Sequence, residues 1–283
     1  MVNKVYVINS RGEKEFFSPR KVYQSARKAG ASKQLAEKIS QQIEKEVYPG
    51  IRTLRIFQRI KKLLSQESPR AALKFHLKQS LFKLGPSGFP FEKFIGEIFS
   101  NNGFKVKLNQ IIQGKCLSYE IDFLAQKDNF LYFGECKFRN RGESLIHSKV
   151  ALANYARFLD IKEGNSLQKL KNLNWQTILV TNNKFSRATI KFSQCKKTGL
   201  LGWRYPKGKS LEKIIEEKRL YPITILPSFK KSFVPFFNSV KIMLAKDILQ
   251  IDLEKFSQKS GLPLKKLLSL NKEAKTLLEE KNN

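Results

Sequence analysis

The amino-acid sequence predicts three parts: an α+β module over residues 1–88, an α/β core with a mixed sheet over residues 89–226, and a helical region over residues 227–283. Two short runs of alternating apolar and polar residues open the chain, and apolar residues at helical spacing follow them. Glycine and proline then cluster in residues 84–90, which ends the helical pattern and marks a short linker. Strand-like and helical runs alternate after this linker, and from residue 227 the pattern is helical and rich in lysine.

The first part is expected to be a β-hairpin, made of an N-terminal strand over residues 4–8, a turn over residues 9–12 and a second strand over residues 13–17, with about four helices after it. Ser18 followed by Pro19 is typical of a helix start, because proline lacks only an N–H that would have no partner there. We expect helices to begin near the following residues: Pro19, Ser32, Gly50 and Ser68.

In the second part, a helix over residues 91–99 precedes two apolar runs that form a hairpin within residues 119–138. Residues 175–182 are almost continuously apolar, which is typical of a buried central strand. Helices are further expected over residues 148–158, 186–195 and 211–217, and a last strand over residues 200–206. In the third part, a helix pair over residues 252–259 and 262–270 fits either packing against the core or a small DNA-contacting unit.

The hairpin within residues 119–138 carries charged residues inside runs that are otherwise apolar, namely Asp122, Glu135 and Lys137. A charged group in a buried strand is costly unless a partner neutralises it. With a turn centred on residues 127–128, Asp122 lies opposite Phe133, so Asp122 and Glu135 are diagonal neighbours on one face. Two carboxylates at this separation can hold a hard divalent cation, Mg²⁺ or Mn²⁺, and Lys137 shares their face.

This arrangement resembles the PD-(D/E)XK restriction-endonuclease-like superfamily, and within it the Mrr-type and Holliday-junction-resolvase branches. The resemblance rests on Asp122, on the run from Glu135 to Lys137 and on the preceding helix. It implies that Asp122 and Glu135 bind the metal, that Lys137 positions or activates a water, and that Glu92 assists. Glu97 is the second choice for the helix carboxylate, and Ile121 stands where the superfamily often has proline.

Residues 3–90 resemble the ATP-cone, a nucleotide-binding regulatory module. The residues that carry this resemblance are Val7, Gly12, Phe17, Lys21, Val22 and residues 53–56. It implies an adenine nucleotide, ATP or dATP, as effector, held by Arg11, Lys21 and Thr53. The family has a Lys–Arg pair in the hairpin turn, whereas this chain has Asn9 and Ser10 there, with Arg11 displaced by one position. A nucleotide sensor and a DNA-docking module therefore both remain open for this part.

The composition points to a polyanionic partner, most simply DNA, because 54 Lys and Arg against 24 Asp and Glu give a net charge of +30. The 283 residues of the chain contain no apolar run long enough for a membrane span and no signal-peptide pattern near the start. Three cysteines without zinc-type spacing predict a reducing, cytoplasmic location and no structural zinc. Cys136 is expected to point to the buried face, opposite Glu135 and Lys137.

Together these features predict a Mg²⁺- or Mn²⁺-dependent endonuclease that hydrolyses DNA phosphodiester bonds under nucleotide control. The alternative is a nucleotide-sensing, nucleic-acid-binding regulator that does not cleave. One active centre per chain makes a homodimer the natural route to a double-strand break.

Overall fold

The computed structural model describes residues 5–85, 87–140 and 144–279, so Lys4 of the expected first strand and Pro86 of the expected linker lie outside the described residues. The chain forms two compact units. The first contains the residues up to Leu77, Ile225–Ser228 and the residues from Leu268 onward; the second contains Lys78–Thr224 and Phe229–Leu267. The three sequence segments ending at residues 88, 226 and 283 are a different division, and they stay a prediction.

The first unit holds a three-stranded sheet of order β2-β1-β3. Strands β1 (Tyr6–Ile8) and β2 (Lys14–Phe16) form the expected antiparallel hairpin, and β3 (Ile51–Arg52) pairs parallel to β1. The expectation that a helix begins at Gly50 is wrong, because Gly50 has a φ of +85° and the next two residues extend beside β1. The helix starts only at Thr53.

The helices predicted for residues 1–88 are present, and the fourth is split in two. They are α1 (Pro19–Lys28), α2 (Lys33–Glu46), α3 (Thr53–Glu67), α4 (Pro69–Phe75) and α5 (Leu77–Phe82). Ser32 caps α2 by accepting a hydrogen bond from the Leu35 N–H, as the sequence predicts. The apolar faces of α1, α2 and α3 meet in a core that includes Ala26, Ile39 and Leu64.

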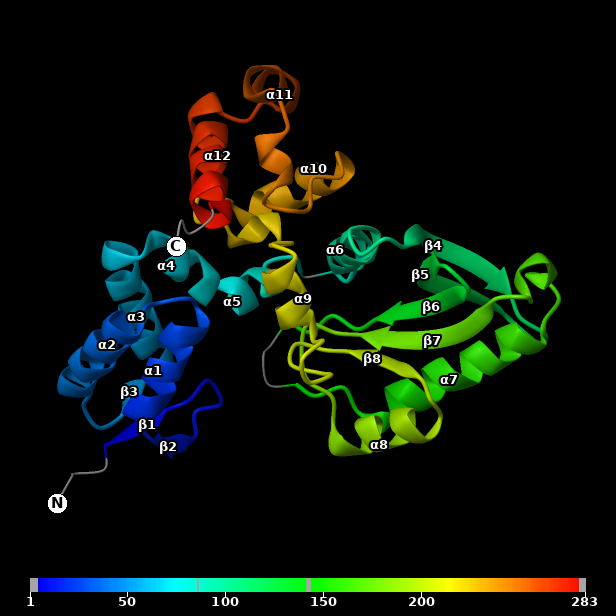
Figure 1. The fold of residues 1–283 in the computed structure, drawn as a ribbon, viewed down its shortest axis with the longest axis horizontal. Coiled ribbons are helices and arrows are strands. Elements are labelled where there is room, and N and C mark those ends of the chain that lie inside the picture. The colour runs from blue at the N-terminus through cyan, green and yellow to red at the C-terminus, as the bar shows by residue number, and fades with distance from the viewer. Residues whose placement is uncertain (1–4, 86, 141–143, 280–283) are drawn as a thin grey trace. The chain divides into compact units, whose positions relative to one another are not determined.

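The second unit is built on a mixed five-stranded sheet of order β4-β5-β6-β7-β8 (Figure 1). The strands are β4 (Lys105–Gln113), β5 (Ser118–Lys127), β6 (Phe130–Cys136), β7 (Asn174–Val180) and β8 (Gly199–Leu201). The first three are antiparallel and the last three parallel, which confirms the expected mixed α/β core. The last strand is shorter than predicted, because the chain turns back at Gly202, whose N–H bonds to the Tyr205 carbonyl.

Helices cover both faces of this sheet (Figure 1). Helix α6 (Phe89–Ser100) packs on one face, and α7 (Ser148–Glu163) and α8 (Arg187–Cys195) pack on the other. The ring of Phe123 meets Phe99 of α6 with centroids 4.8 Å apart, whereas Phe133 meets Phe158 of α7 at 5.6 Å. Strands β5 and β6 are therefore buried on both sides.

The rest of the chain is helical, as predicted for the region after residue 227. Helices α9 (Leu211–Glu217), α10 (Val234–Ser239), α11 (Leu253–Ser260) and α12 (Leu264–Leu278) follow one another. Short 3-10 helices lie at Gln168–Leu170, Ile223–Ile225, Lys231–Phe233 and Asp247–Leu249. Among the described residues, none of the helices combines the length and apolar character needed to cross a membrane.

Candidate active site

The β5–β6 hairpin sets the positions of the charged residues through its turn. Asp128 has a φ of 51° and, with Asn129, makes a two-residue turn, so Leu124 pairs with Phe133 and Phe123 with Gly134. The predicted pairing of Asp122 with Phe133 is therefore wrong by two residues, because the turn lies one residue later than expected. The observed register, continued by one residue, brings Asp122 level with Glu135.

Asp122 is anchored to the neighbouring strand by its carboxylate, which accepts a 2.6 Å hydrogen bond from the Cys136 N–H. On its other side, β4 pairs with the residues before and after it, and Asn109 of β4 has a φ of 51°. Burial raises the pKa of Asp122 to about 6, and the charge of Glu135 adds to the rise. Because the register brings Asp122 level with Glu135, the two carboxylates are close enough for their charges to repel each other.

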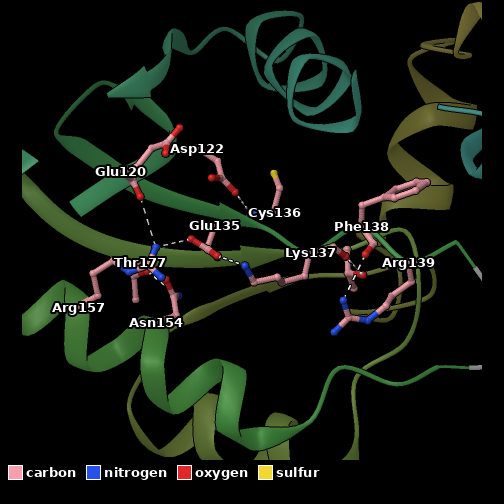
Figure 2. A network of polar contacts seen from close by, with 11 residues as sticks. Glu120, Asp122, Glu135, Cys136, Lys137, Phe138, Arg139, Asn154, Arg157 and Thr177 are labelled. Atoms are coloured by element: carbon pink, nitrogen blue, oxygen red, sulfur yellow. Dashed lines mark hydrogen bonds and ion pairs between the residues drawn. The ribbon is translucent and has the colours of Figure 1, made fainter. Parts of the chain in front are cut away.

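Glu135 is a buried carboxylate held by two cations (Figure 2). It is 4% exposed, and it pairs with Lys137 of the chain beyond β6 and with Arg157 of α7. The Arg157 Nη1 donates to Oε2 at 2.6 Å and lies 3.4 Å from the carbonyl of Glu120. Sequence reasoning missed Arg157, because only the packing of α7 on the sheet brings it to a residue 22 positions earlier.

Glu92 contributes a third carboxylate from α6. Its pKa is raised to about 7, chiefly by burial and then by the charge of Asp122, while a hydrogen bond from Asn109 acts in the opposite direction. Glu135 and Glu120 add smaller repulsions. Glu92 of α6 is therefore close enough to the hairpin carboxylates to feel their charge.

Glu97, the second choice on the same helix, faces a different environment. It lines a cavity of about 330 Å³ with Lys93 and Lys241, and burial and the charge of Asp247 raise its pKa. Of the two helix carboxylates considered from the sequence, Glu92 is the one that lies with Asp122 and Glu135.

Lys137 is held at the end of β6 by its backbone. Its N–H donates to the Val180 carbonyl at 2.8 Å, and its own carbonyl accepts from the Thr181 hydroxyl at 2.6 Å. Below the hairpin, the Asn154 amide donates to Thr177, whose hydroxyl donates to the carbonyl of Phe133 (Figure 2). These bonds tie α7, β6 and β7 together and leave the Lys137 side chain directed at Glu135.

The donor set suits a hard divalent cation, because carboxylate oxygens are the ligands that Mg²⁺ and Mn²⁺ prefer. The mutual repulsion that raises the pKa of Glu92 and Asp122 is what a bound cation would relieve. No three His, Cys, Asp or Glu side chains are grouped closely enough to hold a metal within the described part of the chain. Both carboxylate oxygens of Glu135 are paired, one with Lys137 and one with Arg157, so an ion at Glu135 would have to displace one of these cations.

Cys136 is buried, as predicted, and burial raises its pKa well above the usual range. A thiol in this state is not a nucleophile at neutral pH.

The residues predicted to hold a nucleotide are brought together only in part. Lys21 and Thr53 both line a cavity of about 160 Å³ in the first unit, beside Phe17 and Ser18. Arg11 does not line this cavity, and it lies in the β1–β2 turn, where it pairs with Glu13 at 3.2 Å.

Comparison with known proteins identifies the family. The family model described as AF1548-like, C-terminal, matches residues 221–278. An uncharacterized protein of Archaeoglobus fulgidus is 34% identical over 184 residues, which cover 65% of this chain and 99% of that protein. The crystal structure of the protein of unknown function AF1548 is 32% identical, has a TM-score of 0.58, and is covered over 98% of its length by 68% of this chain. The chain belongs to the AF1548-like family.

A second solved structure, MspJI restriction endonuclease in complex with a 27-mer oligonucleotide, has a TM-score of 0.32 at 16% identity. The match covers 47% of this chain and 29% of that one. A similarity this low does not indicate the fold or the function of this chain.

Proposed function

We propose that this member of the AF1548-like family is a metal-dependent endonuclease that hydrolyses DNA phosphodiester bonds. The observation that carries the proposal is the meeting of Asp122, Glu135 and Lys137 at the end of the β5–β6 hairpin, with Glu92 beside them. Buried carboxylates that repel one another are costly, and a phosphodiester hydrolase needs such a set.

Each residue has a role that its position supports. Asp122 and Glu135 hold the cation, which when bound supplies Lewis acidity at the phosphate and lowers the pKa of its water. Lys137, once released from Glu135, places its ammonium where negative charge develops on the phosphate. Glu92, whose carboxylate is close enough to feel the charge of Asp122, accepts a proton from the attacking water at a carboxylate oxygen.

The charge of the chain supports DNA as the substrate. A net charge of +30 neutralises phosphates and steers a polyanion to the protein. A homodimer would bring two such centres to the two strands of a duplex.

The test is incubation of the full-length protein with supercoiled plasmid, with Mg²⁺, with Mn²⁺ and with EDTA. We expect nicked and linear products only with a metal ion, and none from the Asp122→Asn variant under the same conditions. Metal-dependent DNA binding without any product would instead favour the regulator that does not cleave.

A second function, adenine-nucleotide sensing in the first unit, is favoured by the cavity that Lys21 and Thr53 share. Lys21 also pairs with Glu15 at 3.5 Å, so a triphosphate would have to compete for its ammonium. Titration calorimetry with ATP and dATP tests it. We expect weak binding that Lys21→Ala abolishes and that Arg11→Ala, outside the cavity, changes little. Tight binding unaffected by Lys21→Ala would place the site elsewhere.

A further inference from the structure

The outer face of the small sheet in the first unit carries two different rows of side chains. Residues paired across strands share a face, so Phe16 and Tyr6 form one row, which Gly50 continues beside the Tyr6 ring. The next outward row pairs Lys14 with Ile8, and Ile8 with Arg52 of β3. An aromatic row thus lies next to a row with a cation at each end.

The aromatic row is open to solvent. Phe16 is 64% exposed and Tyr6 is 37% exposed, although both lie in strands and could have faced the core. The Lys14 ammonium lies 5.0 Å from the centroid of the Tyr6 ring, and the Arg52 side chain is exposed. The core of the unit takes Val7 from the inner face and does not include Tyr6, whereas Phe16 also borders the inner cavity that Val7 lines.

The inner and outer faces also differ in charge. Glu15, the acidic residue of β2, pairs with Val7 and so shares its inner face. The outer rows of the three strands therefore contain cations and no carboxylate. The two rows are about 6.5 Å apart along the strands, since two residues advance a strand by that distance. This geometry offers exposed rings close to positive charges, one of which, the Lys14 ammonium, lies over the Tyr6 ring and would be displaced by a base that stacks there.

We propose that this face binds single-stranded DNA, with bases stacked on Phe16 and Tyr6 and phosphates contacted by Lys14 and Arg52. Aromatic platforms flanked by basic side chains are the physical basis of sequence-tolerant single-strand binding. Bases within a duplex are already stacked, so their faces are not accessible to the two rings, and single strands are favoured over duplex. The proposal stands apart from cleavage, because it concerns the first unit and needs no metal.

The experiment measures binding of the full-length protein to a labelled oligothymidine of about 12 nucleotides by fluorescence anisotropy, with EDTA present. We expect Phe16→Ala and Tyr6→Ala each to weaken binding about tenfold, equal to about 1.4 kcal/mol. Phe16→Tyr and Tyr6→Phe, which keep the ring, stay near wild type. Lys14→Gln and Arg52→Gln each reduce the slope of log Kd against log salt by about 0.7.

The matched control is Phe130→Ala, an aromatic residue that is 39% exposed at the end of a strand in the second unit, and it leaves binding unchanged. Thermal unfolding of each variant checks that the fold is retained. Wild-type affinity in both alanine variants of the aromatic row overturns the proposal, as does equal competition by a duplex of the same length. The strand-binding assay contains EDTA and is read without cleavage, so a failed cleavage assay and a failed strand-binding assay are distinguishable.

Discussion

The carboxylate cluster of the second unit and the aromatic–cationic face of the first unit both place charge in strands, but they differ in burial. Glu135 is 4% exposed and needs Arg157 and Lys137 to neutralise it, whereas Lys14 and Arg52 are exposed to water. Removing a charge from water costs several kcal/mol per ion unless partners compensate. A buried cluster of charged side chains is therefore expected only where it has a function. An exposed charge lowers the stability of the fold very little. It therefore indicates a binding site only when the neighbouring side chains are arranged to contact a ligand. Substitutions should therefore affect catalysis and stability at the first site, and affinity alone at the second.

The largest effect is expected at the buried carboxylates. Glu135→Gln and Asp122→Asn keep the shape of the side chains and one acceptor oxygen each, but remove the charge that would bind the metal. We expect cleavage of plasmid to fall by a factor of about 1,000 or more while DNA binding persists.

Glu163→Gln is the matched control for these variants, because Glu163 lies at the end of α7 in the same unit and its side chain is exposed. It should cleave like wild type. Glu135→Ala should in addition lower the free energy of unfolding by about 3–5 kcal/mol, since it leaves Arg157 without its carboxylate partner. Normal nicking by either isosteric variant would remove these residues from the site.

Lys137 tests whether its charge acts on the transition state. Lys137→Ala should lower the cleavage rate about 100-fold with little change in metal affinity, and Lys137→Arg should not restore it, because a planar fork replaces a point charge. Lys107→Ala, at an exposed lysine of the adjacent strand β4, is the control. If Lys137→Ala changed only the Kd for DNA, the residue would be a phosphate-binding group instead.

Arg157 tests the competition for Glu135. Its guanidinium occupies one carboxylate oxygen, so Arg157→Ala frees that oxygen for a cation and should tighten Mn²⁺ binding about tenfold in calorimetry. The same variant should lower the Tm, because it leaves a buried charge with one partner instead of two. Unchanged or weaker metal affinity would show that Arg157 helps to build the site rather than competing for it.

The salt dependence of duplex binding measures the exposed charges. Replacing Lys259, Lys266 and Lys272 by glutamine should reduce the log–log slope by up to about 0.9 for each DNA phosphate that the protein no longer neutralises. Deletion of residues 227–283 is not a suitable test, because it removes Leu267, Leu270 and other fully buried side chains. An unchanged slope would assign these helices a structural role only.

The sequence predicts those features of the candidate site that depend only on neighbouring residues of one strand. The spacing of Glu135 and Lys137 sets their common face whatever the register, because side chains alternate along a strand. The turn was displaced by one residue, because Asp128 takes a positive φ that the residue types around it do not dictate. Contacts that depend on tertiary packing, such as Arg157 with Glu135, leave no signal in spacing.

In the first unit, too, the contacts that depend on tertiary structure could not be predicted from the spacing of residues. Its hairpin and helices were predicted, but β3 was not, because two residues are too few for a periodic pattern. Lys21 and Thr53 share a cavity and Arg11 does not, since the turn that holds Arg11 is fixed by the Asn9 side chain, which accepts from the Arg11 and Glu13 N–H groups. A set of residues scattered over turn, helix and strand thus needs the structure, whereas a set within one hairpin does not.

The smallest effect is expected at Glu97, a half-buried carboxylate outside the cluster. Burial, and then the charge of Asp247, raise its pKa above 4.5. An acid with a raised folded-state pKa stabilises the fold fully below its unfolded-state pKa and loses that contribution as the pH rises through the folded-state value. Glu97→Gln stays neutral throughout, so its Tm should equal that of wild type near pH 4 and exceed it by about 1–2 °C near pH 8.

Glu37→Gln, at an exposed position, is the control for Glu97, and its Tm difference from wild type should not change with pH. A pH-independent Tm difference for Glu97→Gln would mean that burial does not penalise this carboxylate. In that case burial alone would not distinguish the carboxylates of the second unit from exposed charges. The assignment of Asp122 and Glu135 to the active site would then depend on their mutual repulsion and on their cationic partners. A Tm difference that grows with pH would instead show that a half-buried carboxylate of α6 destabilises the fold when it is charged. Glu92 would then carry the same kind of cost, which its proposed function or a bound cation would offset.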